Sequence, residues 1–261
     1  MKCFIVKIGG SVLDHPAALE AFLKAFAAID APKILVHGGG KIASKIGEAL
    51  GIESRYVDGR RITDAPTLDV VTMVYGGLIN KQLVAKLQAA GCNAVGLTGA
   101  DGNVLPAHKR PVKTIDYGFV GDVQAASVNV AWLQQLLVGG ATPVFAPLTH
   151  DSGSLLNTNA DTIASVLAIA LSRLFEVRLI FCFEKKGALL DVNDSDSVIR
   201  HLPRGEYEKL LKQGVFADGI LPKLENAFDA IRAGVQEVLI GDAADLIKNT
   251  SEETAGTLII R

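Results

Sequence analysis

Short runs of apolar, largely β-branched residues alternate along this chain with longer segments whose apolar residues recur at helical spacing. The clearest runs are residues 3–8, 33–36, 94–98, 142–147 and 177–183. Such alternation is typical of a mainly parallel sheet covered by helices on both faces, because parallel strands need crossover connections. The pattern therefore predicts the α/β fold class.

The helices are predicted from the same spacing. Aspartate accepts first-turn N–H groups, so Asp14 is predicted to cap a helix that begins near Pro16. The longest helix is predicted over residues 68–90, with Gly91 just after its end. Its buried face is formed by residues at helical spacing, namely Val70, Val71, Val74, Leu78 and Leu83. Further helices are predicted near residues 130–138, 160–172, 207–213 and 221–233, final strands at 237–240 and 257–260, and lid-forming hairpins within 102–123.

Composition limits the class of partner. Lys and Arg (26) nearly balance Asp and Glu (28) and are scattered, so no footprint for nucleic acid or an anionic membrane is present. The longest apolar runs are too short to span a bilayer, and Lys7 with a glycine pair interrupts the first one. We therefore expect a soluble, cytoplasmic protein that binds small molecules.

The three cysteines, Cys3, Cys92 and Cys182, lie far apart and lack metal-ligand spacing. Reduced, buried thiols are therefore expected, with neither a disulfide nor a metal site. The chain has no repeat or linker, so residues 1–261 are read as one domain. Any division into an N-terminal lobe (about 1–172) and a C-terminal lobe (about 173–261) lies within one continuous sheet.

Two glycine-rich segments follow predicted strands. Lys7 sits in the apolar run CFIVKIGG, where a lysine is costly unless it meets an anion or reaches solvent, and Gly9 and Gly10 allow close backbone approach to a phosphate. The segment ILVHGGGK, residues 34–41, enters a glycine turn that opens a helix. This turn either binds an anion or serves only as a tight connection between strand and helix. It matches neither the dinucleotide-binding nor the P-loop motif, and His37 is expected to be packed rather than catalytic.

Three further segments carry charged or amide side chains. In VDGRRIT, residues 57–63, arginine can grip a carboxylate in bidentate fashion, although Arg60 is better read as a solvated loop charge. LLNTNAD, residues 155–161, brings Asn157, Asn159 and Asp161 to a helix entry, where at least one should be a cap. In FADGILPK, residues 216–223, a turn precedes Lys223 at the start of a helix.

Together these five segments, in this order, resemble the amino acid kinase superfamily along essentially the whole chain, and within it the kinases of N-acylated glutamate. The resemblance implies an open three-layer α/β/α sandwich with a mainly parallel sheet. Its N-terminal lobe would bind the acylamino acid and its C-terminal lobe ATP. The implied reaction is ATP-dependent phosphorylation of the side-chain carboxylate, in arginine biosynthesis, with Mg²⁺ held mainly by the nucleotide phosphates.

The resemblance also implies roles for single residues. Lys7 and Lys223 would stabilise the transferring phosphoryl group, and Asp161 would hold both lysines. The implied acylglutamate-binding residues are Gly39, Gly40, Arg61 and Asn157. The implied nucleotide-binding residues are Gly9, Gly10, Asp218 and Gly219.

The chain departs from the family pattern at one place. The family usually has a Ser/Thr–Asp pair before a glycine, where this chain reads FCFEKKG, residues 181–187, so the resemblance assigns no nucleotide contacts there. The chain also lacks the extra N-terminal helix of arginine-inhibited members, which implies an arginine-insensitive homodimer.

Other readings remain open at this point. The chain could be another kinase of the superfamily, acting on glutamate, aspartate, carbamate or a nucleoside monophosphate, or a nucleotide-sensing regulator that has lost catalysis. The acyl group, acetyl or succinyl, is also open, since the two differ by a few atoms and one charge.

Overall fold

The central element is a mainly parallel sheet. The computed structural model describes residues 1–57, 59–216 and 220–260. Within them an eight-stranded sheet has the order β12-β14-β13-β11-β1-β2-β8-β5, and only the β13–β14 pair is antiparallel. Its strands are β1 (Lys2–Ile8), β2 (Lys33–His37), β5 (Ala94–Leu97), β8 (Thr142–Phe145), β11 (Glu176–Phe183), β12 (His201–Pro203), β13 (Glu237–Asp242) and β14 (Thr257–Ile260). The predicted α/β class is confirmed.

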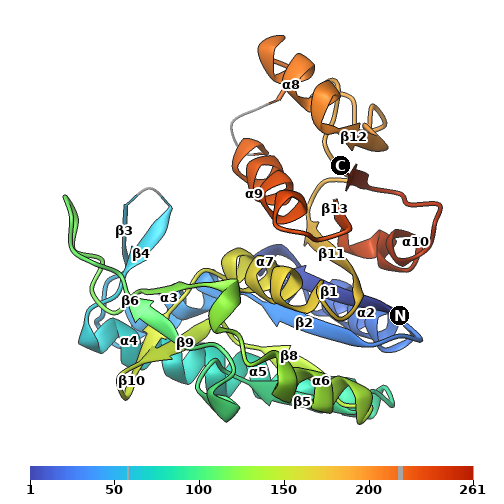
Figure 1. The fold of residues 1–261 in the computed structure, drawn as a ribbon. Helices are drawn as coiled ribbons and strands as arrows, with labels where there is room; N and C mark the ends of the chain where they lie inside the picture. The colour runs from blue at the N-terminus through green and yellow to red at the C-terminus, as the bar shows by residue number, and fades with distance from the viewer. Residues whose placement is uncertain (58, 217–219, 261) are drawn as a thin grey trace.

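Helices cover both faces of this sheet. One apolar core lies under α6 (Val130–Val138), α7 (Ala160–Leu171), α8 (Arg204–Lys212) and α9 (Leu221–Arg232). A second lies under α2 (Pro16–Ala27), α3 (Gly40–Ala49), α4 (Ala65–Val71), α5 (Asn80–Ala89) and α10 (Leu246–Thr250). Figure 1 shows α7 over β1 and β2, with α9 beside β11 and β13. The arrangement is the three-layer sandwich that the family resemblance implies.

Alternation along β1 decides where its lysine points. Cys3 and Ile5 pack into the core under α7, whereas Phe4, Val6 and Ile8 pack into the opposite core. Successive side chains of a strand point to opposite faces, so Lys7 follows Cys3 and Ile5 towards the α7 face. The same alternation that buries the apolar residues of β1 therefore also sets the direction of Lys7.

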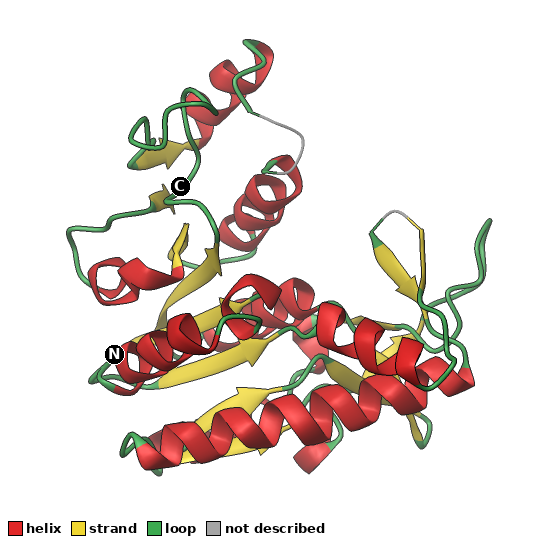
Figure 2. Cartoon of the chain, turned by 180° about the vertical axis from the view of Figure 1, so that it is seen from behind, coloured by secondary structure: helices red, strands yellow, loops and turns green. Residues whose placement is uncertain are grey.

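The predicted long helix is continuous but not uniform. Between α4 and α5, residues Thr72–Ile79 form the π-helix η1, and Figure 2 shows the whole run crossing one face of the sheet. Gly91 follows its end with a φ of +76°, as predicted. The prediction that Leu78 is buried is wrong, because it is 42% exposed. The i→i+5 bonding of a π-helix adds a residue to each turn and so rotates Leu78 off the buried face.

The predicted cap of α2 is also wrong. Residues Gly10–Leu13 form the short helix α1, and Asp14 directly follows it. The N-cap of α2 is His15, which makes no side-chain capping bond. The residue before a proline is driven to extended conformations, so the break before Pro16 falls at His15.

Three hairpins extend the fold beyond the main sheet. They pair β3 (Arg55–Val57) with β4 (Arg60–Ile62), β6 (Ala107–Lys109) with β7 (Gly121–Val123), and β9 (Leu148–Asp151) with β10 (Ser154–Asn157). The β6–β7 pair confirms a hairpin within residues 102–123, while its role as a lid stays a prediction. The β3–β4 hairpin, β12 and α10 were not predicted. Single 3₁₀ turns occur at Asp101–Asn103, Ala125–Ser127 and Ala243–Asp245.

Candidate functional site

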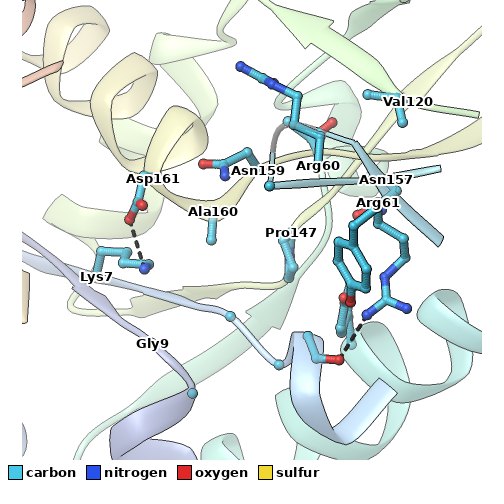
Figure 3. A pocket seen from close by; sticks show the side chains of 18 residues that line it. Lys7, Gly9, Arg60, Arg61, Val120, Pro147, Asn157, Asn159, Ala160 and Asp161 are labelled. Carbon is cyan, nitrogen blue, oxygen red and sulfur yellow. Dashed lines mark hydrogen bonds and ion pairs between the residues drawn. The ribbon is translucent and has the colours of Figure 1, made fainter. Parts of the chain in front are cut away.

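A lysine and an aspartate form the centre of the site. Lys7 lies near the carboxyl end of β1, and Asp161 lies in the first turn of α7. Lys7 Nζ is 2.7 Å from Asp161 Oδ1, and the two side chains are only 13% and 22% exposed (Figure 3). The acidic group is well placed at the positive end of a helix dipole.

A second lysine reaches the same carboxylate from the C-terminal part of the chain. Lys223, in the first turn of α9, places its Nζ 3.9 Å from Asp161 Oδ2. Burial acts to raise the pKa of the Asp161 carboxyl, but the positive charges of Lys7 and Lys223 outweigh it and hold the pKa below its usual value. Asp161 is therefore ionised, and the three side chains carry a net positive charge.

The glycine segment after β2 makes close backbone contacts. Gly39 has a φ of +150°, and a Cβ built on it would lie 2.3 Å from Cδ1 of Ile79 and 3.2 Å from the ring of Tyr75. Only glycine fits that conformation and that space. Helix α3 begins directly after it, and the first N–H groups of a helix lack helical acceptors. The turn thus brings backbone donors to the site without intervening side chains.

Arg61 is buried next to that turn. It is 7% exposed, its Nη2 donates to the Gly40 carbonyl at 2.8 Å and to Ser44 Oγ at 3.0 Å, and its Nη1 donates to Ser54 Oγ. Its guanidinium also stacks over Tyr56. None of these partners is a carboxylate, and it forms no ion pair with any carboxylate that the structure describes. A buried cation without an anionic partner favours an anionic ligand.

The two asparagines take different positions. Asn157 ends β10, and its Nδ2 donates to Thr63 Oγ1 at 3.0 Å. Asn159 is the N-cap of α7, where its Oδ1 accepts the N–H of Thr162 at 3.0 Å. The prediction that one of these residues is a cap is therefore confirmed for Asn159.

One cavity of about 260 Å³ collects most of the predicted site residues. It is lined by Lys7, Gly9, Gly10, Gly39, Gly40, Arg61, Asn157 and Asp161, and by the exposed Arg60. Tyr75, which no sequence pattern singled out, also lines it. An aromatic residue within the apolar run of a helix reads as core, and only the structure shows that this one faces the glycine turn.

A second cavity, of about 280 Å³, is lined by Lys223, which does not line the first. Apolar side chains line most of it, among them Leu189, Val192, Val215 and Phe216. Phe183, Glu184, Lys185 and Gly187 of the divergent segment also line it. Asp218 and Gly219, predicted to bind nucleotide, lie outside the described residues.

His37 is packed, as predicted. It is fully buried, and its Nδ1 donates to the Gly38 carbonyl at 2.8 Å while its Nε2 accepts from Asn80 Nδ2 at 3.2 Å. Burial lowers the pKa of His37 to about 4, so the ring is neutral near pH 7. All three cysteines are free and buried.

The described part of the chain shows neither a metal-binding cluster nor a membrane-spanning helix. No group of three or more His, Cys, Asp or Glu side chains is arranged to hold a metal ion there. None of the helices described combines the length and apolar character that crossing a bilayer requires.

Known proteins resemble this chain over its whole length. The sequence profile of the amino acid kinase family matches residues 2–242. An acetylglutamate kinase of Cytophaga hutchinsonii is 56% identical over 99% of this chain and 98% of its own, and one of Bacteroides thetaiotaomicron is 57% identical over 95% and 96%. The solved structure of smu.665 from Streptococcus mutans UA159 is 28% identical, with a TM-score of 0.77 over 99% of this chain and 98% of that one. By profile, by sequence and by fold, the chain belongs to the amino acid kinase family.

Proposed function

We propose that this chain transfers the γ-phosphoryl group of ATP to the side-chain carboxylate of N-acetyl-L-glutamate, a step of arginine biosynthesis. The observation that carries the proposal is the placement of two ammonium groups, Lys7 and Lys223, around Asp161, where the two cavities approach each other. Relatives called acetylglutamate kinase, more than half identical to this chain, support the choice of acceptor.

The acylglutamate is assigned to the cavity between the glycine turn and Arg61. Arg61 supplies a buried positive charge for the α-carboxylate, and the amide of Asn157 and the backbone of Gly39 and Gly40 supply hydrogen bonds. This position points the side-chain carboxylate of the substrate towards Lys7. It uses each predicted acceptor-binding residue that lines the cavity.

The nucleotide is assigned to the second cavity. Its apolar walls suit a base, and Lys223, which lines it, pairs with Asp161 of the first cavity, so the phosphates would extend towards Gly9 and Gly10. Asp218 and Gly219 are proposed nucleotide contacts on family resemblance alone. The two lobes of the chain, about 1–172 and 173–261, would accordingly hold acceptor and donor.

The chemistry needs positioning and positive charge rather than a base. The acceptor carboxylate, with a reference pKa of about 4.3, is ionised at neutral pH and attacks the γ-phosphorus. The bond from that phosphorus to the bridging oxygen breaks, giving an acyl phosphate and ADP. Charge spreads over the equatorial phosphoryl oxygens, where Lys7 and Lys223 stabilise it. Asp161 remains ionised and keeps the two ammonium groups close together.

Mg²⁺ is proposed to arrive with the nucleotide. The described residues offer no cage of three or more ligands, and Asp161 is committed to two lysines. The ion would neutralise phosphate charge when bound, and the protein side chains named above act without ligating it.

A homodimer is proposed from the long helical run. Met73 and Leu78 of η1 are 55% and 42% exposed and lie five residues apart, the spacing that a π-helix brings to one face. An exposed apolar face of this kind suits a second copy of the chain. Light scattering of the wild type and of Met73→Asp tests it, and a monomeric wild type would contradict it.

The activity is tested by an ADP-release assay with ATP and a panel of acceptors: N-acetylglutamate, N-succinylglutamate, glutamate, aspartate, carbamate and UMP. N-acetylglutamate should give the highest kcat/KM, and hydroxylamine should trap its product as a hydroxamate, which identifies an acyl phosphate. Higher kcat/KM for another acceptor would reassign the substrate. ATP binding without turnover of any acceptor would indicate a nucleotide sensor.

A further inference from the structure

The two lysines at the centre of the site are held unequally. Lys7 Nζ is 2.7 Å from the Asp161 carboxylate, whereas Lys223 Nζ is 3.9 Å from it and its side chain is more exposed, at 31% against 13%. A lysine ammonium is a point charge on a flexible four-carbon stem. Asp161 alone therefore restrains Lys223 weakly.

The start of α9 does not favour a positive charge either. Lys223 is the third residue of this 12-residue helix. The N-terminus of a helix carries a partial positive charge, which disfavours a nearby cation. A further contact near the ammonium would therefore add to its restraint.

The ring of Phe183 provides that contact. Lys223 Nζ lies 5.7 Å from its ring centroid, within the range of a cation–π interaction. Phe183 ends β11 opposite Asp242 of β13, so its backbone is fixed by the sheet rather than by a loop. The ring is thus attached to sheet backbone beside a flexible cation.

We propose that Phe183 is a positioning residue, whose ring face holds the Lys223 ammonium between Asp161 and the migrating phosphoryl group. The proposal rests on the proposed kinase function. It gives a role to the segment FCFEKKG, where this chain departs from the family's Ser/Thr–Asp pair. The quadrupole of an aromatic ring attracts the lysine without competing for the phosphate.

The competing explanation is that Phe183 packs against the nucleotide base. It lines the same cavity as Phe216 and Val215, so an apolar contact is sterically available. The two roles differ in kinetics. A base contact, which forms before the reaction, would change the KM for ATP, whereas a misplaced Lys223 would lower kcat.

The closing experiment replaces Phe183 with Leu, with Tyr, and with phenylalanines carrying one, two or three ring fluorines, which weaken the quadrupole with little change of shape. Phe183→Leu should lower kcat by about five- to thirty-fold, the equivalent of one cation–π contact, with a KM for ATP within about two-fold of wild type. Phe183→Tyr should restore kcat. The logarithm of kcat should fall steadily with each fluorine.

Phe228 is the matched control. It lies on α9 like Lys223, but its buried ring packs against Tyr207, lines neither cavity and, among the described residues, has no cation over it. Its fluorination should leave kcat unchanged. In a Lys223→Ala background, fluorination of Phe183 should also have no effect on residual turnover. A kcat insensitive to Phe183 fluorination, or a loss confined to the KM for ATP, overturns the proposal.

A stability measurement separates this proposal from the kinase function. The losses of unfolding free energy caused by Phe183→Leu and Lys223→Ala should be non-additive in urea unfolding of the single and double variants. Each substitution removes one partner of the same contact. A wild type without turnover would end the proposed function, and additive unfolding losses would then reject the contact independently. If the wild type is active, the effect of the fluorine series on kcat decides whether Phe183 positions Lys223.

Discussion

The Lys7 ammonium and the Asp161 carboxylate lie 2.7 Å apart although they come from opposite ends of the N-terminal part of the chain. The contact follows from two simple rules. Alternation along β1 turns Lys7 to the face that α7 covers, and Asp161 occupies the first turn of α7, at the same edge of the sheet. The ion pair is therefore a direct product of sheet geometry.

Replacing either lysine should remove one charge-stabilising donor. We expect Lys7→Ala and Lys223→Ala each to lower kcat by on the order of a hundredfold or more, in steady-state assays with N-acetylglutamate. Lys41→Ala is the matched control, since its exposed ammonium pairs only loosely with Asp14 at 3.6 Å. Near-normal kcat in both site variants would refute the assignment.

Replacing Arg61 should affect acceptor binding. Arg61→Ala removes the buried positive charge beside Gly40, and we expect mainly a higher KM for the acylamino acid. Arg60→Ala, which removes an exposed neighbouring charge, should have a smaller effect. The assignment fails if the KM for ATP rises selectively instead.

The neutral, buried His37 should make stability depend on pH. Its pKa is about 4 in the folded protein and about 6.5 when unfolded, so between these values the unfolded state binds more protons. Its contribution is complete above about pH 6.5 and falls by about 3 kcal/mol as the pH drops to about 4. Urea unfolding of wild type and His37→Gln across this window measures the difference. Parallel curves for the two proteins would show that His37 does not titrate this way.

Adding a methyl group at Gly39 should destabilise the glycine turn. Gly39→Ala places a Cβ against Ile79 and forces a left-handed conformation on alanine, so we expect a loss of at least ~1–3 kcal/mol and weaker acceptor binding. Gly77→Ala is the control, because a Cβ there meets no atom within 4 Å. Thermal unfolding of both variants is the measurement, and equal Tm values would contradict the prediction.

Patterns that depend on local sequence were predictable. The bounds of α6 and β14 were predicted to the residue. The bounds of β11 were predicted nearly so, because burial on both faces of a strand leaves a continuous apolar signal. The π-helical turn at Leu78 was not predictable, since it depends on backbone geometry that side-chain spacing does not report. The N-cap at His15 was missed although the residue before Pro16 is a local signal for it. β12, with three residues, is too short to carry a period.

The site residues likewise divide into those that a sequence motif identifies and those that only tertiary contacts identify. Family resemblance named Lys7, Asp161 and Lys223, and the structure brings them together. The sequence did not show that Tyr75 and Phe183 line cavities, because aromatic residues in apolar runs have the same pattern whether they fill a core or face a cavity. Only neighbours distant in sequence, Gly39 for one and Lys223 for the other, distinguish the two cases.

The seven-residue pairing of β1 with β11 also determines what can be made in pieces. A fragment cut after residue 172 would lose β11 and leave the apolar strand β1 with a bare edge, and such edges recruit other chains. The complementary fragment would expose the opposite edge. Splitting the gene after residue 172 is therefore expected to yield insoluble protein rather than two folded fragments.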